Sequence, residues 1–225
     1  MIPLRLADPG EAADLAGFLT RLLRYDRAAA VRLQAAAGGG ALAVFGRPPS
    51  FEVLAVRAVR LAEPVGPPLD RTVSAGELLE SVSETRAELG IPNAVTGPPW
   101  TGVLPPRGDW APLPGLPAPD AMGRAVAAAV AEFRARDEAL PEERRTRAER
   151  DRIGREIWSR TLGATALPLR AVHAATSLGF LRPGADEGAV ALLGAAGWLR
   201  LRTPYGSVAT RRTAGGLGDL SVRPV

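Results

Sequence analysis

The chain has 225 residues, contains no cysteine, and carries 28 basic and 24 acidic residues, which gives a formal net charge of +4. The absence of cysteine excludes disulfide bonds, thiolate metal sites and a cysteine nucleophile. A hydrophobic content of 46% is typical of a globular protein and excludes a disordered chain. The chain has no lysine, so all 28 of these basic residues are arginine, a composition typical of a bacterium with a GC-rich genome.

Targeting and cofactor signals are missing from the sequence. The N-terminus lacks the charged-then-apolar pattern of a secretion signal, and no apolar run reaches the roughly 18 residues of a membrane span. We therefore expect a cytoplasmic protein without a membrane segment. No motif predicts a cofactor or a metal site.

The first expected element is a long helix. Asp8, Pro9 and Glu11 are typical of a helix start, because they supply a capping oxygen, a preset φ and a negative charge near the positive end. Apolar residues then follow at helical spacing. The pattern predicts a helix from residue 8 to about residue 36, with a break at Tyr25–Asp26.

Two strands are expected next, over 41–45 and 51–63. The alternation of the second strand slips near Arg57, which predicts a β-bulge. A proline-containing loop over 63–71 follows.

A capping box starts the next expected helix, because Ser74 precedes Glu77 by three residues. The helix is predicted to run to about Leu89. It would carry a line of acidic side chains at helical spacing, namely Glu77, Glu80, Glu84 and Glu88. Such a line either holds a divalent metal, docks a basic partner or is a solvated face. The solvated face is favoured, because it is the commonest case and no histidine accompanies the glutamates.

Residues 91–119, here called the Pro-rich strap, contain nine prolines in 29 residues, together with Trp100 and Trp110. This density of proline excludes long regular elements. Two large rings favour burial, so we expect an extended segment pinned across the body by both tryptophans. The alternatives are a packed segment without function and a lid or binding surface for a partner or ligand.

Helices are expected over much of 120–181. The part from Pro141 to Arg160 has seven Arg and five acids, which predicts a solvated, ion-paired helix that docks at its end. His173, the single histidine, lies in a last helix opened by Pro168. Either it is a packed side chain or it contributes to a ligand or active site. No nucleophile motif accompanies it.

The C-terminal part, from Gly197 to Arg212, alternates arginine with aliphatic residues and contains a turn at 203–206, which predicts a β-hairpin. Residues 189–193 are either a third strand or a helix. The last 29 residues hold five Arg and one acid, and so contain the whole net charge. We expect a basic sheet edge that either binds phosphates or protects the sheet against aggregation. Its candidate nucleic-acid-binding residues are Arg200, Arg202, Arg211 and Arg212.

Together these patterns predict an α+β fold in which antiparallel strands from both ends of the chain, about 41–63 and 189–212, pack with several helices. The expected parts are a helix, hairpin and helix over 1–90, the Pro-rich strap over 91–119, and a helical part with the basic hairpin over 120–225. All three can also form a single domain.

The sequence carries no strong catalytic motif, and it predicts no catalytic residue. The leading hypothesis is a non-enzymatic cytoplasmic binding module whose partner is another protein, with Trp100, Trp110 and His173 on the partner or ligand surface. The first alternative is a nucleic-acid-binding protein that uses the basic hairpin. The second is an enzyme for a small molecule, with its site under the Pro-rich strap.

Overall fold

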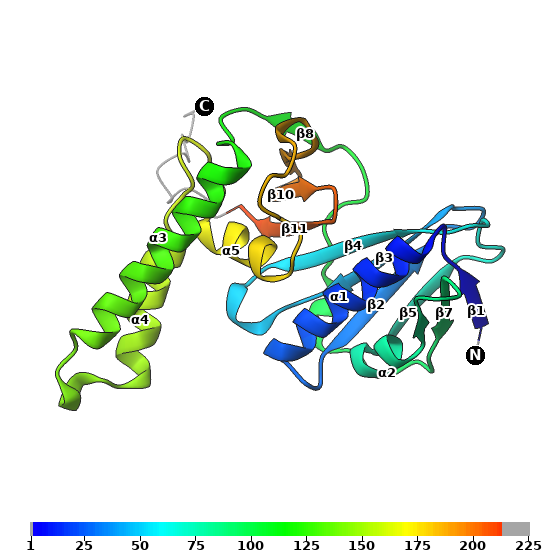
Figure 1. The fold of residues 1–225 in the computed structure, drawn as a ribbon, viewed down its shortest axis with the longest axis horizontal. Helices are drawn as coiled ribbons and strands as arrows, with labels where there is room; N and C mark the ends of the chain where they lie inside the picture. Colours follow the sequence, from blue (N-terminus) through cyan, green and yellow to red (C-terminus); the bar gives the residue numbers. More distant parts are fainter. Residues whose placement is uncertain (1, 213–225) are drawn as a thin grey trace, which may run out of the picture.

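The computed structural model describes residues 2–212, and these form an α+β fold with two antiparallel sheets and five α-helices (Figure 1). The strands of the larger sheet are β2 (Ala30–Ala35), β3 (Ala41–Gly46), β4 (Leu54–Arg60), β5 (Leu69–Ser74), β8 (Ala111–Leu113), β9 (Ala191–Ala195), β10 (Trp198–Thr203) and β11 (Gly206–Arg211). Their order is β5-β2-β3-β4-β11-β10-β9-β8. Because β4 pairs with β11, strands from both ends of the chain share one sheet, as predicted.

The smaller sheet and one short helix lie beside the N-terminal strands of the larger sheet. This sheet consists of β1 (Ile2–Arg5), β7 (Glu88–Ile91) and β6 (Val82–Ser83), in that order. Helix α2 (Ala75–Glu80) contacts both β7 and helix α1 (Pro9–Tyr25).

One face of the large sheet is covered by α1 and by α5 (Leu169–Ser177), as Figure 1 shows. Helix α1 packs closely enough that a Cβ on Gly46 of β3 would lie 2.8 Å from the Leu22 side chain. The main core lies between these helices and the sheet, and it includes Phe18, Leu33, Phe180 and Leu201. The opposite face carries the Pro-rich strap, and we call it the strap face.

Helices α3 (Pro119–Glu138) and α4 (Arg147–Trp158) project from the body as a pair, here called the helical arm (Figure 1). Ion pairs link the two helices, with Arg136 to Glu156 at 2.8 Å and Arg160 to Glu132 at 2.6 Å. Ile157 is buried at the docked end of α4. The prediction of an ion-paired helix that docks at its end is confirmed. Within residues 2–212, no helix combines the length and apolar character needed to cross a membrane.

The predicted helix from 8 to 36 is correct only in its first part. Asp8 caps α1, since its Oδ1 accepts a hydrogen bond from the Glu11 amide at 3.0 Å. After Tyr25 the chain turns, and the residues predicted as the rest of the helix form β2. The helical pattern was misleading there because alanine fits both the helical and the strand periodicity. In the structure the buried residues of β2 alternate, as they do in a strand with one buried face.

The predicted bulge in β4 is wrong. The pairing of β3 with β4 runs without interruption from Ala41 opposite Arg60 to Gly46 opposite Ala55. The alternation slips because residues 54–57 are buried on both faces of the sheet. Apolar and polar residues therefore stop alternating although the strand is regular.

The capping box at Ser74 is confirmed, since its Oγ accepts a hydrogen bond from the Glu77 amide at 3.4 Å. The helix that follows ends at Glu80, however, and the predicted extension to Leu89 is wrong. Ser81 Oγ donates to the Leu78 carbonyl oxygen and also lies 2.7 Å from the Gly90 carbonyl oxygen. The end of the helix is therefore held against β7. The four glutamates consequently lie on α2, on a turn and on β7 rather than in one line. The described residues include no group of three His, Cys, Asp or Glu that could hold a metal ion.

The predicted basic sheet edge is wrong as well. Hairpin β10–β11 lies inside the large sheet, between β4 and β9, and residues 191–195 are a strand. The sheet ends instead at β5 and at β8, a three-residue strand that contains Pro112. The arginines of the hairpin therefore do not protect an edge, and protection falls to the short, proline-containing β8.

Candidate functional site

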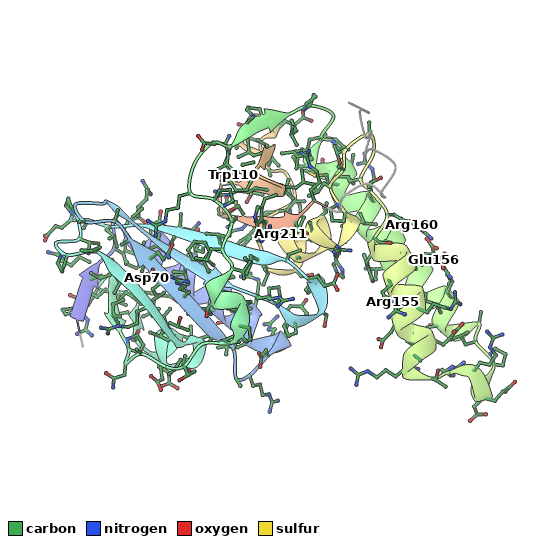
Figure 2. All side chains as sticks on the ribbon, turned by 180° about the vertical axis from the view of Figure 1, so that it is seen from behind. Asp70, Trp110, Arg155, Glu156, Arg160 and Arg211 are labelled. Atoms are coloured by element: carbon green, nitrogen blue, oxygen red, sulfur yellow. The ribbon has the colours of Figure 1, made fainter. Side chains whose placement is uncertain are left out.

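The strap face of the large sheet collects aromatic and arginine side chains from distant parts of the chain. In hairpin β10–β11, Leu199 and Leu201 face the main core, whereas Trp198, Arg200 and Arg202 alternate with them. Arg211 lies directly opposite Trp198 in the pairing and so shares the strap face. Figure 2 shows Arg211 and Trp110 in the half of the body from which the helical arm projects, with Asp70 on the side away from the arm.

The Pro-rich strap is attached to this face by a second, small hydrophobic core. Leu54, Trp198 and Ala209 are buried in it, and Trp100, Leu104 and Trp110 of the strap pack against them. The Trp110 indole donates a hydrogen bond to the Pro106 carbonyl at 3.0 Å. The two tryptophans predicted to pin the strap thus contact a third, Trp198 of β10, which no sequence pattern marked as part of this site.

An arginine that is fixed by a salt bridge binds the strap near its middle. Arg32 on β2 donates two hydrogen bonds of 2.7 Å to Asp70 on β5, and it also donates to the Thr101 carbonyl of the strap. Gln34 donates to the same carboxylate at 2.9 Å. The hydrogen bonds from Arg32 hold the pKa of Asp70 below its ordinary value. Asp70 therefore stays ionised and neutralises Arg32.

A cavity of about 570 Å³, here called the Trp cavity, opens beside Trp100. Its lining residues are Arg47, Glu52, Val53, Leu54, Pro99, Trp100, Val103, Arg170, Trp198, Ala209, Thr210 and Arg211. The Arg211 guanidinium lies 4.5 Å from the centre of the Trp198 ring. Arg170 lies 3.6 Å from Glu52, and its buried Nε has no hydrogen-bond partner among the described residues.

A second cavity of about 550 Å³, here called the Arg200 cavity, lies on the other side of the strap turn Pro99–Gly102. Its lining residues are Arg32, Gln34, Ala35, Ala36, Ala41, Ala43, Phe45, Val56, Ala58, Gly102, Leu104, Pro105, Pro106, Arg107 and Arg200. The Arg200 guanidinium donates to Ser207 Oγ at 2.9 Å and lies 5.6 Å from the Trp110 ring centre. Burial, and then the nearby Arg202, lower the pKa of Arg200.

The remaining candidate residues lie apart from these cavities. Arg202 and Arg212 are exposed and line neither of them. His173 lies on α5, stacked on Trp158 at 4.4 Å and edge-on to Phe51 at 5.1 Å. It is packed between two rings, and the structure does not bring it together with Trp100 and Trp110. Arg47 and Arg107, which do line the cavities, were not selected because a lone arginine in a loop carries no local signal.

The packing of His173 predicts how stability depends on pH. Burial lowers its pKa in the folded chain, whereas the unfolded chain has the ordinary value of about 6.5. As the pH falls through 6.5 the unfolded chain therefore binds a proton that the folded chain does not, and stability decreases. His173→Phe should remove this loss, because the ring packing stays but the titration does not. Urea midpoints at pH 7.5 and 5.5 test this, since the chain has no other histidine, and an unchanged pH difference in the variant would contradict it.

Comparison with known proteins finds two matches, one on each part of the chain. Residues 1–102 match a domain of unknown function, DUF8010, and residues 105–215 match a second domain of unknown function, DUF8185. No curated protein matches the chain. The chain is thus similar to two domain families of unknown function, whose matched ranges meet within the Pro-rich strap and whose strands join in the large sheet.

Proposed function

We propose that the chain is a non-enzymatic binding module that docks an acidic segment of another protein on the surface around the Trp cavity. The observation that carries this proposal is the combination of accessible apolar side chains with guanidinium groups that lack a carboxylate partner within residues 2–212. Arg47 and Arg211 are such groups. Tryptophan and arginine are the residues in which the binding energy of protein interfaces concentrates.

The apolar part of this surface extends along the strap. Val95 and Val103 are 39% and 49% exposed, and they are two of the three exposed large hydrophobic residues in the described part of the chain. A neighbouring cavity of about 870 Å³ contains Val95 and shares Trp100 and Arg47 with the Trp cavity. An apolar surface of this kind favours a partner with aliphatic or aromatic side chains.

The charge of the same surface favours an acidic partner. The Trp cavity has three arginines and one glutamate in its lining, and that glutamate already lies near Arg170. Glu52 is also the only carboxylate or imidazole among the residues that line the Trp and Arg200 cavities. This composition supports recognition of a negative group rather than acid–base catalysis, because the side chains that most often transfer protons are His, Glu and Asp, and Glu52 already lies near Arg170.

The test is a selection from a displayed library of random peptides of about 12 residues, followed by affinity measurements on one selected peptide that has been synthesised. We expect the selected peptides to combine Asp or Glu with aliphatic or aromatic residues. Arg211→Gln should weaken the affinity for the selected peptide about tenfold, because it removes a positive charge at the Trp cavity. Arg155→Gln is the matched control, since Arg155 is exposed on the helical arm, away from Arg211 (Figure 2), and should leave the affinity unchanged. Peptides without acidic enrichment, or equal loss in both variants, would contradict the proposal.

A second candidate partner is single-stranded nucleic acid. It is favoured by the two guanidinium–tryptophan pairs, Arg200 with Trp110 and Arg211 with Trp198, because charge beside an aromatic face is how such strands are bound. A labelled oligothymidylate distinguishes the two partners. Tighter binding to the oligothymidylate than to the selected peptide would favour nucleic acid. The logarithm of the binding constant should then fall with the logarithm of the salt concentration, with a slope of about −0.7 per phosphate neutralised. Binding should be lost when Arg200, Arg202, Arg211 and Arg212 are replaced together.

A further inference from the structure

The Arg200 cavity is a separate site from the surface just described. It shares no lining residue with the Trp cavity, and the strap turn Pro99–Gly102 lies between the two. Its floor is formed by strands β2, β3 and β4, and its opposite wall by the strap segment Leu104–Arg107. A ligand in this cavity would therefore touch both of the ranges that match domain families.

The floor of the cavity is largely apolar, and alanines form much of it beside Phe45 and Val56. Ala43 on β3 lies directly opposite Ala58 on β4, and Ala41 is next on the same face. Ala41 and Ala58 are exposed and Ala43 is half-buried, so their methyl groups are not covered by other parts of the described chain. Larger side chains at these positions would fill the space. These alanines, together with Pro105 and Pro106 of the strap, give the cavity an apolar lining on both the sheet and the strap.

The charge of the cavity is positive and not fully compensated. Three arginines line it, and Asp70 beside it neutralises Arg32. Arg107 also lies near enough to Asp70 to lower the pKa of that carboxylate. Counting this single acid against Arg32, Arg107 and Arg200 leaves a net charge of +2.

Arg200 carries the part of this charge that most needs a partner. It is half-buried, and within residues 2–212 no carboxylate lies within ion-pair distance of it. Its described side-chain hydrogen bond uses Nε, with Ser207 as acceptor. A buried charge without a counter-ion is unfavourable, and a guanidinium satisfies a carboxylate or phosphate with two parallel hydrogen bonds.

We propose that the Arg200 cavity binds a small organic anion with a planar ring. The phosphate or carboxylate group lies on Arg200 and Arg107, and the ring lies between the alanine floor and the strap prolines. A volume of about 550 Å³ accommodates a ligand of this size. This site does not depend on the docking surface around the Trp cavity, because the residues differ.

Calorimetric titration of the full chain with adenosine monophosphate, 2-naphthoate and inorganic phosphate tests the proposal and distinguishes the source of the anion. We expect one of the two ring-bearing anions to bind more tightly than inorganic phosphate. Arg200→Gln should weaken the ligand at least about tenfold. Arg202→Gln is the matched control, because Arg202 is on the same strand and face but does not line the cavity, and it should change the affinity about twofold or less.

Ala43→Leu tests the alanine floor without changing a charge. It should abolish binding of the ring-bearing anion, and Ala58→Leu, which fills the same cavity from β4, should do the same if Ala43→Leu fails to fold. Failure of both ring-bearing anions to bind at millimolar concentration, or equal affinity for inorganic phosphate with no effect of either leucine, would overturn the proposal. Peptide binding by the Arg200→Gln variant keeps the two proposals apart, since it should be unchanged whatever happens at this cavity.

Discussion

Arg57→Met should lower the free energy of unfolding by up to about 3–5 kcal/mol, because the buried Glu11 carboxylate loses its buried partner and keeps only the exposed Arg60. Arg57 on β4 and Glu11 on α1 are 5% and 9% exposed in their side chains, and their charged atoms are 2.6 Å apart. Arg57 also lies 3.4 Å from Asp14, which in turn binds Arg182 at 2.7 Å. This network joins α1 to the large sheet and to the segment after α5.

Urea denaturation measures the effect, and two further variants show whether burial is its cause. Arg60→Met removes the other arginine that binds Glu11, but the Arg60 side chain is 70% exposed, so its effect should be much smaller. The double variant Arg57→Met with Glu11→Met should recover much of the loss, since two apolar side chains can replace a buried ion pair. Equal losses for Arg57→Met and Arg60→Met would show that burial of the pair is unimportant.

Trp198→Ala should also cost about 3–5 kcal/mol, the range typical of a buried tryptophan replaced by alanine. Trp198 is 6% exposed and lies in the small core that attaches the Pro-rich strap. Its loss removes the surface on which Trp100 and Trp110 rest. We therefore expect the strap to detach before the rest of the chain unfolds.

Limited digestion with chymotrypsin, followed by mass spectrometry, reads out this detachment. In Trp198→Ala, cleavage after Trp100 and after Trp110 should appear earlier than in the wild type. Val103→Ala is the control, because Val103 is on the same strap but 49% exposed, and it should change neither stability nor cleavage by much. An unfolding transition in which the strap and the body are lost together would mean that the small core does not hold the strap independently.

Local patterns were reliable where one residue type decides the structure. The Asp8 and Ser74 caps were predicted from their spacing and are present, because a cap involves only four successive residues. Hairpin β10–β11 was predicted from its alternation and turn residues for the same reason. Helix length was less reliable. The runs after Tyr25 and after Glu80 contain strands, because pairing with β3, β5 and β7 outweighs local helix propensity, even that of the alanines in β2.

The candidate site was predicted only in part. The unusual proline density and the rings of Trp100 and Trp110 made the strap recognisable as a segment held by aromatic residues. The cavities beside it were not predictable, because they arise where β3, β4 and β10 meet the strap. His173 was one of the selected residues, yet its neighbours in space, Phe51 and Trp158, come from distant segments.

By itself, the sequence determined the fold class, the two helix caps, the hairpin and the strap, because each depends on residues close together in the chain. Only the tertiary structure decided that the basic hairpin lies inside an eight-stranded sheet, and that Arg200 and Arg211 line two cavities with strap residues. Strand neighbours such as β4 and β11 are about 150 residues apart, and no local pattern specifies which strands pair. The charge of the hairpin was visible in the sequence, but its surroundings depend on that pairing.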